Sequence, residues 1–252
     1  MALHLECFIP AYNEAEDLAG SVSEVVAFCR AQVRAPWQVT VLDNGSTDAT
    51  AAIADELARA TAEVRAIHYP EKGRGQALRR AFLASEAKWI GYMDADLSTH
   101  LRALPEALRR LEEGADLVVG SRLMRGSHTT RRLRREVLSR VYNALVRGAF
   151  GTGLRDHQCG FKFFDRARSR ALVAATRDDK WFFDTELLVL ADRAGLRIDE
   201  IPVDWIEDLG STVRIVRTVV DDLRGMRRLY VRVGPAGRRV PAGAAPLDGR
   251  HG

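Results

Sequence analysis

Two acidic residues, Asp94 and Asp96, follow directly after the apolar segment 89–93 and are separated by Ala95 alone. Burial and mutual repulsion would raise the pKa of one carboxyl group unless the two carboxylates share a cation. Mg²⁺ and Mn²⁺ prefer hard oxygen ligands, and Mg²⁺ is often held by one or two carboxylates together with water and substrate phosphates. The pair therefore predicts a Mg²⁺ or Mn²⁺ site for a nucleoside diphosphate. The alternative is that Asp96 caps the next helix while Asp94 lies in a surface turn.

Two further segments carry residues that suit a nucleotide. Asp43 ends an apolar run and precedes Asn-Gly-Ser-Thr-Asp, in which Thr47 or Asp48 can cap a helix, so that Asp43 can accept hydrogen bonds from a base or ribose. Lys72 and Arg74 flank Gly73 ahead of a predicted helix, which is a plausible anion contact. Each segment alone is equally typical of an ordinary turn. Neither GxxxxGK[ST] nor GxGxxG occurs in the sequence, so no P-loop or dinucleotide fingerprint is indicated.

The elements that must position these residues alternate between β-rich runs and helical stretches, which is typical of βαβ units and a mainly parallel sheet. Strands are predicted over residues 3–12, 37–46, 64–70, 88–96 and 116–122. Helices are predicted to begin at 14–17 and to span 47–62, 73–87 and 104–113. The candidate residues then lie where strands end, and open parallel sheets bind ligands at that carboxyl edge.

Beyond residue 120 the pattern is less regular. A basic segment, a helix over 140–150, a loop with Gly, His and Cys, a helix over 183–195 and a strand over 197–205 are predicted. Basic residues cluster at 124–136 and 214–239, which predicts phosphate-rich partners: a nucleotide, a lipid phosphate or an anionic membrane face. Apolar residues recur at helical spacing over 213–233 with arginines between them, so this helix either lies in a membrane interface or docks on the sheet. The tail 234–252, rich in Gly, Pro, Ala and Arg, is expected to be disordered.

The composition sets the broad class. A chain of 252 residues with 46% hydrophobic content suits one large α/β domain or two small ones. No apolar run approaches the roughly 20 residues that span a bilayer, and the N-terminus does not read as a signal peptide, so a cytoplasmic location is expected. The three cysteines are widely spaced and indicate neither a disulfide framework nor a zinc site.

Taken together, eight ordered motifs resemble the family-2 glycosyltransferases of the GT-A fold, most closely the polyprenyl-phosphate sugar synthases of the dolichyl-phosphate glucosyl and mannosyl types. The resemblance covers about residues 3 to 230. The motifs are "IPAYNE" (9–14), "LDNGSTDAT" (42–50), "KGRGQAL" (72–78), "MDADLS" (93–98), "GSR" (120–122), "DHQCGFKFF" (156–164), "FFDTELL" (182–188) and "IPVDWIEDLGS" (201–211).

This resemblance implies an α/β GT-A fold, with a Rossmann-like, mainly parallel central sheet flanked by helices. It implies one domain over 1–233, with a nucleotide-binding half (1–122), an acceptor and sugar half (123–212) and a basic amphipathic helix (213–233). The expected reaction is inverting, metal-dependent transfer of glucose or mannose, from UDP-glucose or GDP-mannose, to a polyprenyl phosphate. The glucosyl type, and hence UDP-glucose, is slightly favoured. The Gln-x-x-Arg-Trp signature of processive synthases is absent, which favours single transfer. The expected partners are the cytoplasmic membrane face, through peripheral attachment, or a membrane protein, and no nucleic acid.

The resemblance also implies roles for individual residues. Asp94 and Asp96 would hold the metal and, with Arg122, act in catalysis. Nucleotide-sugar binding would further involve Pro10, Tyr12, Glu14, Asp43, Lys72, Gly73 and Ala95. Acceptor binding would involve Arg122, Arg131, Arg135, Lys162 and Ser211. Asp184 and Glu186 are the remaining acid candidates in catalysis, or simply favourable acids at a helix N-terminus. His157 and Cys159 are expected to be structural.

Other classes remain open at this stage. A soluble small-molecule or glycan acceptor is used by relatives in this family. An apolar strand followed by DxDx[TV] also opens the haloacid-dehalogenase phosphatases, in which the first aspartate is the nucleophile, but here some 90 residues precede it. A non-catalytic nucleotide-binding module is the third possibility.

Overall fold

The computed structural model describes residues 2–130, 133–206 and 215–235. The five strands predicted in the first half are confirmed: β1 (Leu5–Ala11), β2 (Trp37–Asn44), β3 (Val64–Tyr69), β4 (Trp89–Met93) and β5 (Leu117–Ser121). The predicted helices are α1 (Leu18–Gln32), α2 (Thr50–Ala60), α3 (Arg74–Ala84) and α4 (Leu104–Glu112). All residues of β1, β4 and β5 are buried, as expected for parallel strands covered on both faces.

The second half differs from the sequence-based prediction in one central element. The segment predicted as a pocket loop contains strand β7 (Phe161–Asp165), and helix α6 (Arg166–Ala175) follows it. The helix predicted over 140–150 is longer, since α5 spans Leu133–Phe150. The remaining elements are β6 (Thr129–Thr130), α7 (Phe183–Arg193), β8 (Ile198–Pro202), β9 (Trp205–Ile206) and α8 (Ile215–Val233).

One seven-stranded sheet forms the centre of the molecule, in the order β3-β2-β1-β4-β7-β5-β8. All neighbouring strands are parallel except β7, which is antiparallel to both β4 and β5. The chain leaves β1 for β2 and β3 on one side and returns to β4 on the other, which makes the ends of β1 and β4 a topological switch point. Ligands bind at such a point in open α/β sheets.

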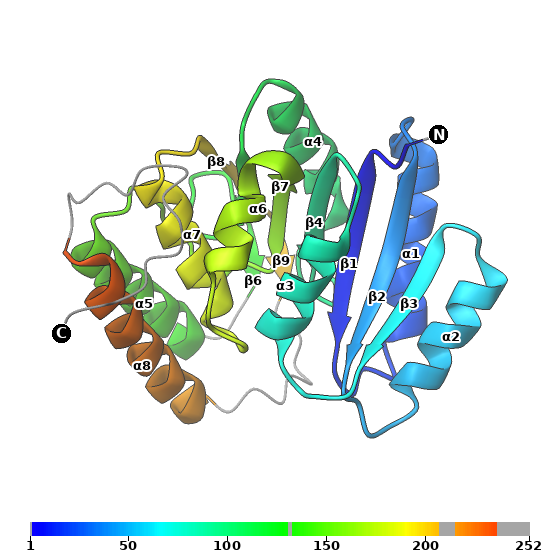
Figure 1. Cartoon of the computed structure of the whole chain (residues 1–252), viewed down its shortest axis with the longest axis horizontal. Coiled ribbons are helices and arrows are strands. Elements are labelled where there is room, and N and C mark those ends of the chain that lie inside the picture. The colour runs from blue at the N-terminus through cyan, green and yellow to red at the C-terminus, as the bar shows by residue number, and fades with distance from the viewer. Residues whose placement is uncertain (1, 131–132, 207–214, 236–252) are drawn as a thin grey trace.

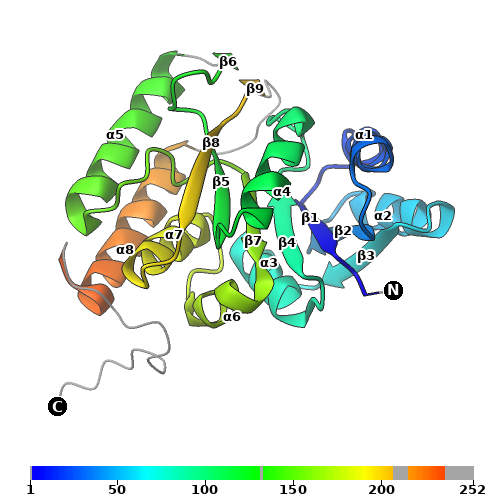
Figure 2. The same cartoon turned by 90° about the horizontal axis from the view of Figure 1, so that it is seen from above.

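Helices cover both faces of this sheet (Figures 1 and 2). One buried cluster joins α1, α2 and α4 to one face, and a second joins α3, α6 and α7 to the other. The two faces alternate along β1: Cys7 and Ile9 belong to the first cluster and Phe8 to the second. A third cluster packs α5 and α8 against α7, away from β1 to β3.

Strand β7 ties the second half of the chain into the sheet of the first half. Gly91 on β4 pairs with Phe163 on β7, and a side chain at position 91 would overlap the Phe163 ring. No helix in the described part of the chain is both long and apolar enough to cross a membrane. The tail predicted to be disordered lies outside the described residues from position 236 onward.

Candidate active site

The switch point brings the predicted nucleotide residues together. Ala11 at the end of β1 pairs in register with Asp43 on β2, and β4 on the other side of β1 ends one residue before Asp94. Parallel neighbours end at the same edge, so Pro10, Tyr12 and Asp43 lie on the edge that carries Asp94.

The loops after β1 and β2 are fastened to each other by side chains. The Ser46 hydroxyl accepts a hydrogen bond from the Asn13 backbone N–H at 3.0 Å, and the Asn13 side-chain oxygen accepts one from the Thr47 N–H at 2.8 Å. Asn13 has a φ of 57°, which asparagine adopts more readily than most residues. The Glu14 N–H donates to the Thr50 hydroxyl at 2.9 Å. The motif residues 12–14 and 43–50 therefore form one preorganised surface.

Asp43 is buried and already has protein partners. Its Oδ1 accepts a hydrogen bond from the Ser46 N–H at 3.1 Å, and its Oδ2 lies 3.3 Å from His68 Nδ1. The other ring nitrogen of His68 lies 2.9 Å from Asp55 Oδ1. The hydrogen bond to Asp55, followed by the one to Asp43, raises the pKa of His68.

The residues after β3 lie over the same edge. The ammonium of Lys72 lies 3.2 Å from the centroid of the Tyr12 ring, a cation–π contact that links this loop to the end of β1. The Gly73 N–H donates to Asn44 Oδ1 at 3.3 Å, and Asn44 in turn donates to the carbonyl oxygen of Ala11 at 2.6 Å.

Asp94 is held between a guanidinium and a glycine. Arg74, the first residue of α3, donates from Nη2 to Asp94 Oδ1 at 2.9 Å, while the Asp94 side chain stays 31% exposed. On its other side the carboxylate lies against Gly160, where a Cβ atom would overlap Oδ2 and would lie 2.5 Å from Oδ1. The carboxylate therefore occupies the space that any other residue at position 160 would fill.

Asp96 is oriented by Ser98. Its two carboxylate oxygens accept hydrogen bonds from the Ser98 N–H at 3.0 Å and the Ser98 hydroxyl at 2.6 Å. Leu97 has a φ of 46°, which turns the chain sharply between these residues. Ala95 is buried beneath the turn.

Asp94 is connected through Arg74 to two buried charged residues, Asp184 and Lys162. Arg74 Nη1 donates to Asp184 Oδ2 at 2.7 Å, and Lys162 Nζ donates to Asp184 Oδ1 at 3.1 Å and to the Cys159 carbonyl oxygen at 2.5 Å. Burial lowers the pKa of Lys162 to about 7 and raises that of Asp184. Burial opposes the charge on Arg74 as well, but Asp184 and Asp94 more than offset it and raise its pKa.

Lys162 is thus not the loop cation that the sequence predicted. It lies on strand β7, its side chain is fully buried, and its ammonium is bound by Asp184 rather than presented to an acceptor. The reason is that residues 161–164 form a continuous buried strand. The preceding Cys159 and Gly160 led to the prediction of a loop over this segment.

Arg122 follows β5 and is clamped to a buried aspartate. Its Nε and Nη2 donate to the two oxygens of Asp156 at 2.7 and 2.9 Å, and its backbone N–H donates to Oδ2 at 3.1 Å. Burial opposes the charge on Asp156, yet the guanidinium lowers the pKa of that carboxyl well below its usual range. The Arg122 guanidinium also lies 5.4 Å from the centroid of the Trp205 ring. The position of Arg122 is fixed, so only part of its charge is left for a ligand.

Other predicted residues lie elsewhere. Glu186 accepts hydrogen bonds from the Arg177 and Asp178 N–H groups, both at 2.8 Å, and from Arg232 on α8 at 3.0 Å, so it fastens helices rather than joining the Asp94 group. Arg135 lies in the first turn of α5. Arg131 and Ser211 lie outside the described residues.

His157 has a structural environment, as expected for it. It is buried with Nδ1 2.8 Å from Asn143 Oδ1 and Nε2 2.9 Å from the Thr152 hydroxyl, and burial lowers its pKa to about 4. The next residue, Gln158, donates to Asp222 on α8 at 2.9 Å.

Two residues of the site, Asp156 and Gly160, had no individual role in the sequence-based prediction, and Arg74, predicted as an anion contact, instead binds the carboxylates of Asp94 and Asp184. Asp156 and Gly160 lie within the "DHQCGFKFF" motif, and Arg74 lies within "KGRGQAL". Their motifs marked the segments, but spacing along the chain gave no sign of which side chains would meet.

The residues present fit a divalent cation. Asp94 and Asp96 offer hard oxygen ligands, and the Gly160 cradle and Ser98 fix the two carboxylates. Among the described residues no group of three or more His, Cys, Asp or Glu side chains could hold a metal. A cation here would therefore take its other ligands from water and from substrate phosphates, which is the usual arrangement for Mg²⁺.

A mainly parallel sheet with a pair of carboxylates at the end of a central strand is the arrangement of the GT-A fold. The sequence profile described as Glycosyl transferase family 2 matches residues 6–172. The chain belongs to this family, which confirms the predicted fold and enzyme class.

Named relatives agree with this assignment. The chain is 41% identical over 215 residues to Glycosyltransferase AglD of Haloferax volcanii, covering 84% of this chain and 34% of that protein. It is 31% identical over 219 residues to Dolichyl-phosphate beta-glucosyltransferase ALG5C of Trichomonas vaginalis, covering 82% of this chain and 65% of that one. The chain thus spans about a third and just under two thirds of the lengths of these two relatives.

The fold also matches solved structures. The crystal structure of glucosyl-3-phosphoglycerate synthase from Mycobacterium tuberculosis, in complex with Mn²⁺ and uridine-diphosphate-glucose, superposes with a TM-score of 0.65. The match covers 89% of this chain and 79% of that one at 21% identity. At this identity the likeness concerns the fold.

Proposed function

We propose that the protein transfers a hexose from a nucleotide-sugar to a polyprenyl phosphate, with a divalent cation held by Asp94 and Asp96. The observation that carries this proposal is the Asp94 carboxylate, fixed between Arg74 and Gly160 and set beside Asp96 at the switch point. A fixed anionic pair at this edge suits a cation and the diphosphate that it bridges.

Different residues of the chain would bind different parts of the nucleotide-sugar donor. The fastened loops after β1 and β2, with Asp43, would bind the nucleoside, and Lys72 and Arg122 would bind phosphate oxygens. The bound cation would neutralise the charge that develops on the departing nucleoside diphosphate. The buried Arg74–Asp184–Lys162 chain would keep Asp94 in place while that charge changes.

The acceptor is inferred from the surroundings of Asp184 and Glu186, the two acidic residues predicted as candidates in catalysis. Asp184 is 2% exposed and is held by both Arg74 and Lys162, and Glu186 is occupied by backbone N–H groups. Neither is placed to take a proton from a sugar hydroxyl. A polyprenyl phosphate needs no such base because it is already anionic at neutral pH. The dolichyl-phosphate glucosyltransferase names among the relatives support the same acceptor class.

The donor is proposed to be UDP-glucose. Relatives are named as beta-glucosyltransferases, and the mycobacterial neighbour was crystallised with uridine-diphosphate-glucose and Mn²⁺. GDP-mannose is the competing donor, and Mg²⁺ is the competing cation.

A thermal-shift panel with transfer assays tests the proposal. UDP-glucose should raise the Tm in the presence of Mn²⁺ or Mg²⁺, and should do so much less in EDTA. Asp96→Asn should abolish that shift, whereas Asp192→Asn, at the far end of α7, should retain it. If no nucleotide-sugar raises the Tm with either metal, the proposal is wrong.

The acceptor is tested by incubation with labelled UDP-glucose and undecaprenyl or dolichyl phosphate in detergent. Label should move into the organic phase with the lipid phosphate and should stay in the aqueous phase with the dephosphorylated lipid. Transfer to 3-phosphoglycerate in place of the lipid would instead assign a soluble phosphorylated acceptor, as in the name of the mycobacterial neighbour.

A further inference from the structure

Helices α5 and α8 carry nearly all the large apolar side chains that the described chain exposes. Only Trp181 and Ile206 among them lie elsewhere. Leu133 is 77% exposed, and the other α5 members are between 42% and 51% exposed. The set on α5, called here the α5 apolar face, consists of Leu133, Val137, Leu138, Val141 and Leu145.

The α5 apolar face is not the side that packs on the protein. Asn143, Val146 and Phe150 form the buried side of α5, and the last two belong to the cluster shared with α7 and α8. A helix with apolar residues on both its buried and its outward side is suited to a second apolar neighbour.

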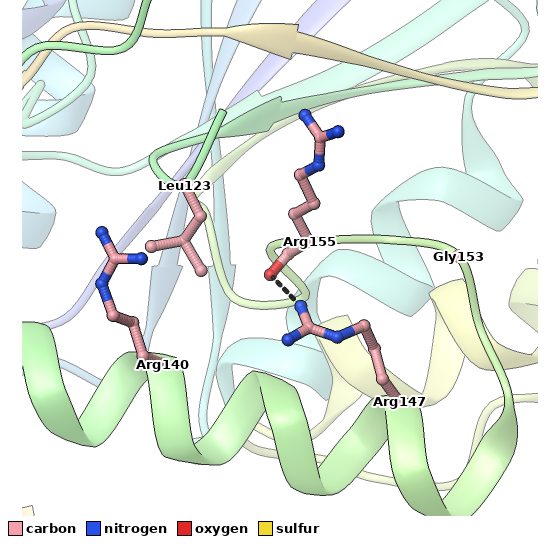
Figure 3. A pocket seen from close by; sticks show the side chains of 5 residues that line it. All are labelled: Leu123, Arg140, Arg147, Gly153 and Arg155. Atoms are coloured by element: carbon pink, nitrogen blue, oxygen red, sulfur yellow. Dashed lines mark hydrogen bonds between the residues drawn. The ribbon is translucent and has the colours of Figure 1, made fainter. Parts of the chain in front are cut away.

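A hollow lined by three arginines borders this helix (Figure 3). Its volume is about 420 Å³, and its lining consists of Leu123, Arg140, Arg147, Gly153 and Arg155. Figure 3 shows Arg147 rising from α5 toward the loop that carries Gly153 and Arg155, while Arg140 rises from the same helix toward Leu123. No carboxylate lines it.

The charge of the hollow is only partly compensated. Arg140 pairs with Glu136 one turn earlier on α5. Arg147 donates to the Arg155 carbonyl oxygen at 3.5 Å, and the described part of the chain shows no carboxylate paired with the guanidinium of Arg147 or of Arg155, although the Arg155 backbone N–H donates to Glu200. A hollow with guanidinium groups in its lining and no carboxylate suits a phosphate, which a planar guanidinium can bind through paired hydrogen bonds.

The arginines run beside the apolar face. Arg140 and Arg147 are seven residues apart, about two helical turns, and so lie in one row on α5. Val137 and Val141 lie on the neighbouring strip of the helix surface. An apolar strip bordered by arginines is the pattern of a helix that lies in the interface of an anionic membrane.

We propose that α5 docks the protein on an anionic phospholipid bilayer, with the α5 apolar face in the interfacial layer and a lipid phosphate in the arginine hollow. The purpose of this docking rests on the proposed function. Leu123 at the rim follows Arg122 directly, so docking would bring lipid-borne phosphates to the sheet edge that carries the site.

Sedimentation with vesicles tests the docking without any transfer reaction. The protein should bind vesicles of phosphatidylcholine and phosphatidylglycerol in equal parts, should bind pure phosphatidylcholine weakly, and should be released by salt. Failure to bind the anionic vesicles at low salt would overturn the proposal. The donor-induced Tm shift without vesicles is measured on the same samples, so a failed docking surface is distinguished from a failed proposed function.

Paired variants test the assignment to α5. Val137→Ser with Val141→Ser should weaken partitioning by more than about 10-fold through lost apolar burial. Arg147→Gln with Arg155→Gln should weaken it about 30-fold, because each basic residue near an anionic leaflet contributes about 1 kcal/mol. The matched control Arg34→Gln, an exposed arginine beyond α1, should bind like the wild type. All these side chains are at least partly exposed, so the variants should fold.

Three results would contradict the assignment. If the α5 variants bound anionic vesicles as tightly as the wild type, α5 would not be the part of the protein that contacts the membrane. A loss as large in Val231→Ser, on α8, would move the docking face to that helix, where Val231 is 80% exposed. Light scattering could also show a dimer that the valine variants convert to a monomer. In that case the α5 apolar face would bind a second copy of the chain and not a membrane.

Discussion

Replacing Gly160 with alanine tests whether Asp94 must lie where the structure places it. Gly160 does not have the positive φ that favours glycine, so alanine is compatible with the backbone and the added Cβ is the whole perturbation. That Cβ would overlap Asp94 Oδ2, and Oδ1 would lie 2.5 Å from it, although real Cβ contacts do not come within 3.0 Å. Because Oδ2 is the atom that overlaps most, the carboxylate must move by more than about 1 Å.

The size of the effect follows from what the displacement breaks. The Arg74–Asp94 ion pair, with Asp94 31% exposed, would weaken and lower the free energy of unfolding by about 1 kcal/mol. That corresponds to a loss of roughly 2–4 °C in Tm for a domain of this size. The functional loss should be larger, because misplacing a group that orients a metal or a substrate costs on the order of 10- to 100-fold.

Two measurements separate the loss of stability from the loss of function. Isothermal titration calorimetry with UDP-glucose and Mn²⁺ gives the donor affinity, and a Tm measured without ligand gives the stability. Gly20→Ala is the matched control, since a Cβ at position 20 on α1 meets nothing within 4 Å. Gly160→Ala should lose affinity well beyond its small loss of Tm, whereas the control should keep its affinity. Wild-type affinity in Gly160→Ala would refute the inference that this carboxylate position matters for the donor.

Three further predictions concern single side chains. Asp184→Asn should lower the free energy of unfolding by about 3–5 kcal/mol in urea, because it leaves the buried Lys162 ammonium without its carboxylate partner and leaves Arg74 with Asp94 alone; a loss no larger than that of Asp192→Asn would contradict the buried network. Glu186→Gln should lower it by about 1–3 kcal/mol while leaving KM for the donor unchanged, and a raised KM would place Glu186 in the site after all. The raised pKa of His68 predicts a contribution to stability that is complete below the unfolded-state pKa, near 6.5, and is lost as pH rises through the folded-state pKa. The stability of the wild type relative to His68→Gln should therefore fall with rising pH in chemical denaturation, and a difference independent of pH would refute this assignment.

Much of the fold could be predicted because the strands and helices of its first half follow from local patterns of apolar and polar residues. Buried strands such as β1, β4 and β5 are short apolar runs followed by polar turn residues, and after β1 and β4 the next element is a helix. Strand β7 escaped prediction because its sequence, Phe-Lys-Phe-Phe-Asp, follows Gly160 and carries a lysine. That lysine can be buried because Asp184, from α7, and the Cys159 carbonyl oxygen accept its hydrogen bonds.

The sequence by itself determined that acidic and basic residues gather at the ends of parallel strands, since strand direction and chain order place those ends on one edge. Only the tertiary structure decided which of them meet. Arg74 contacts Asp94 and Asp184, which are 20 and 110 residues away, and Asp94 lies against Gly160 through the antiparallel insertion of β7. Such pairings depend on the packing of α3, α7 and β7 on one another, and no local periodicity encodes that packing.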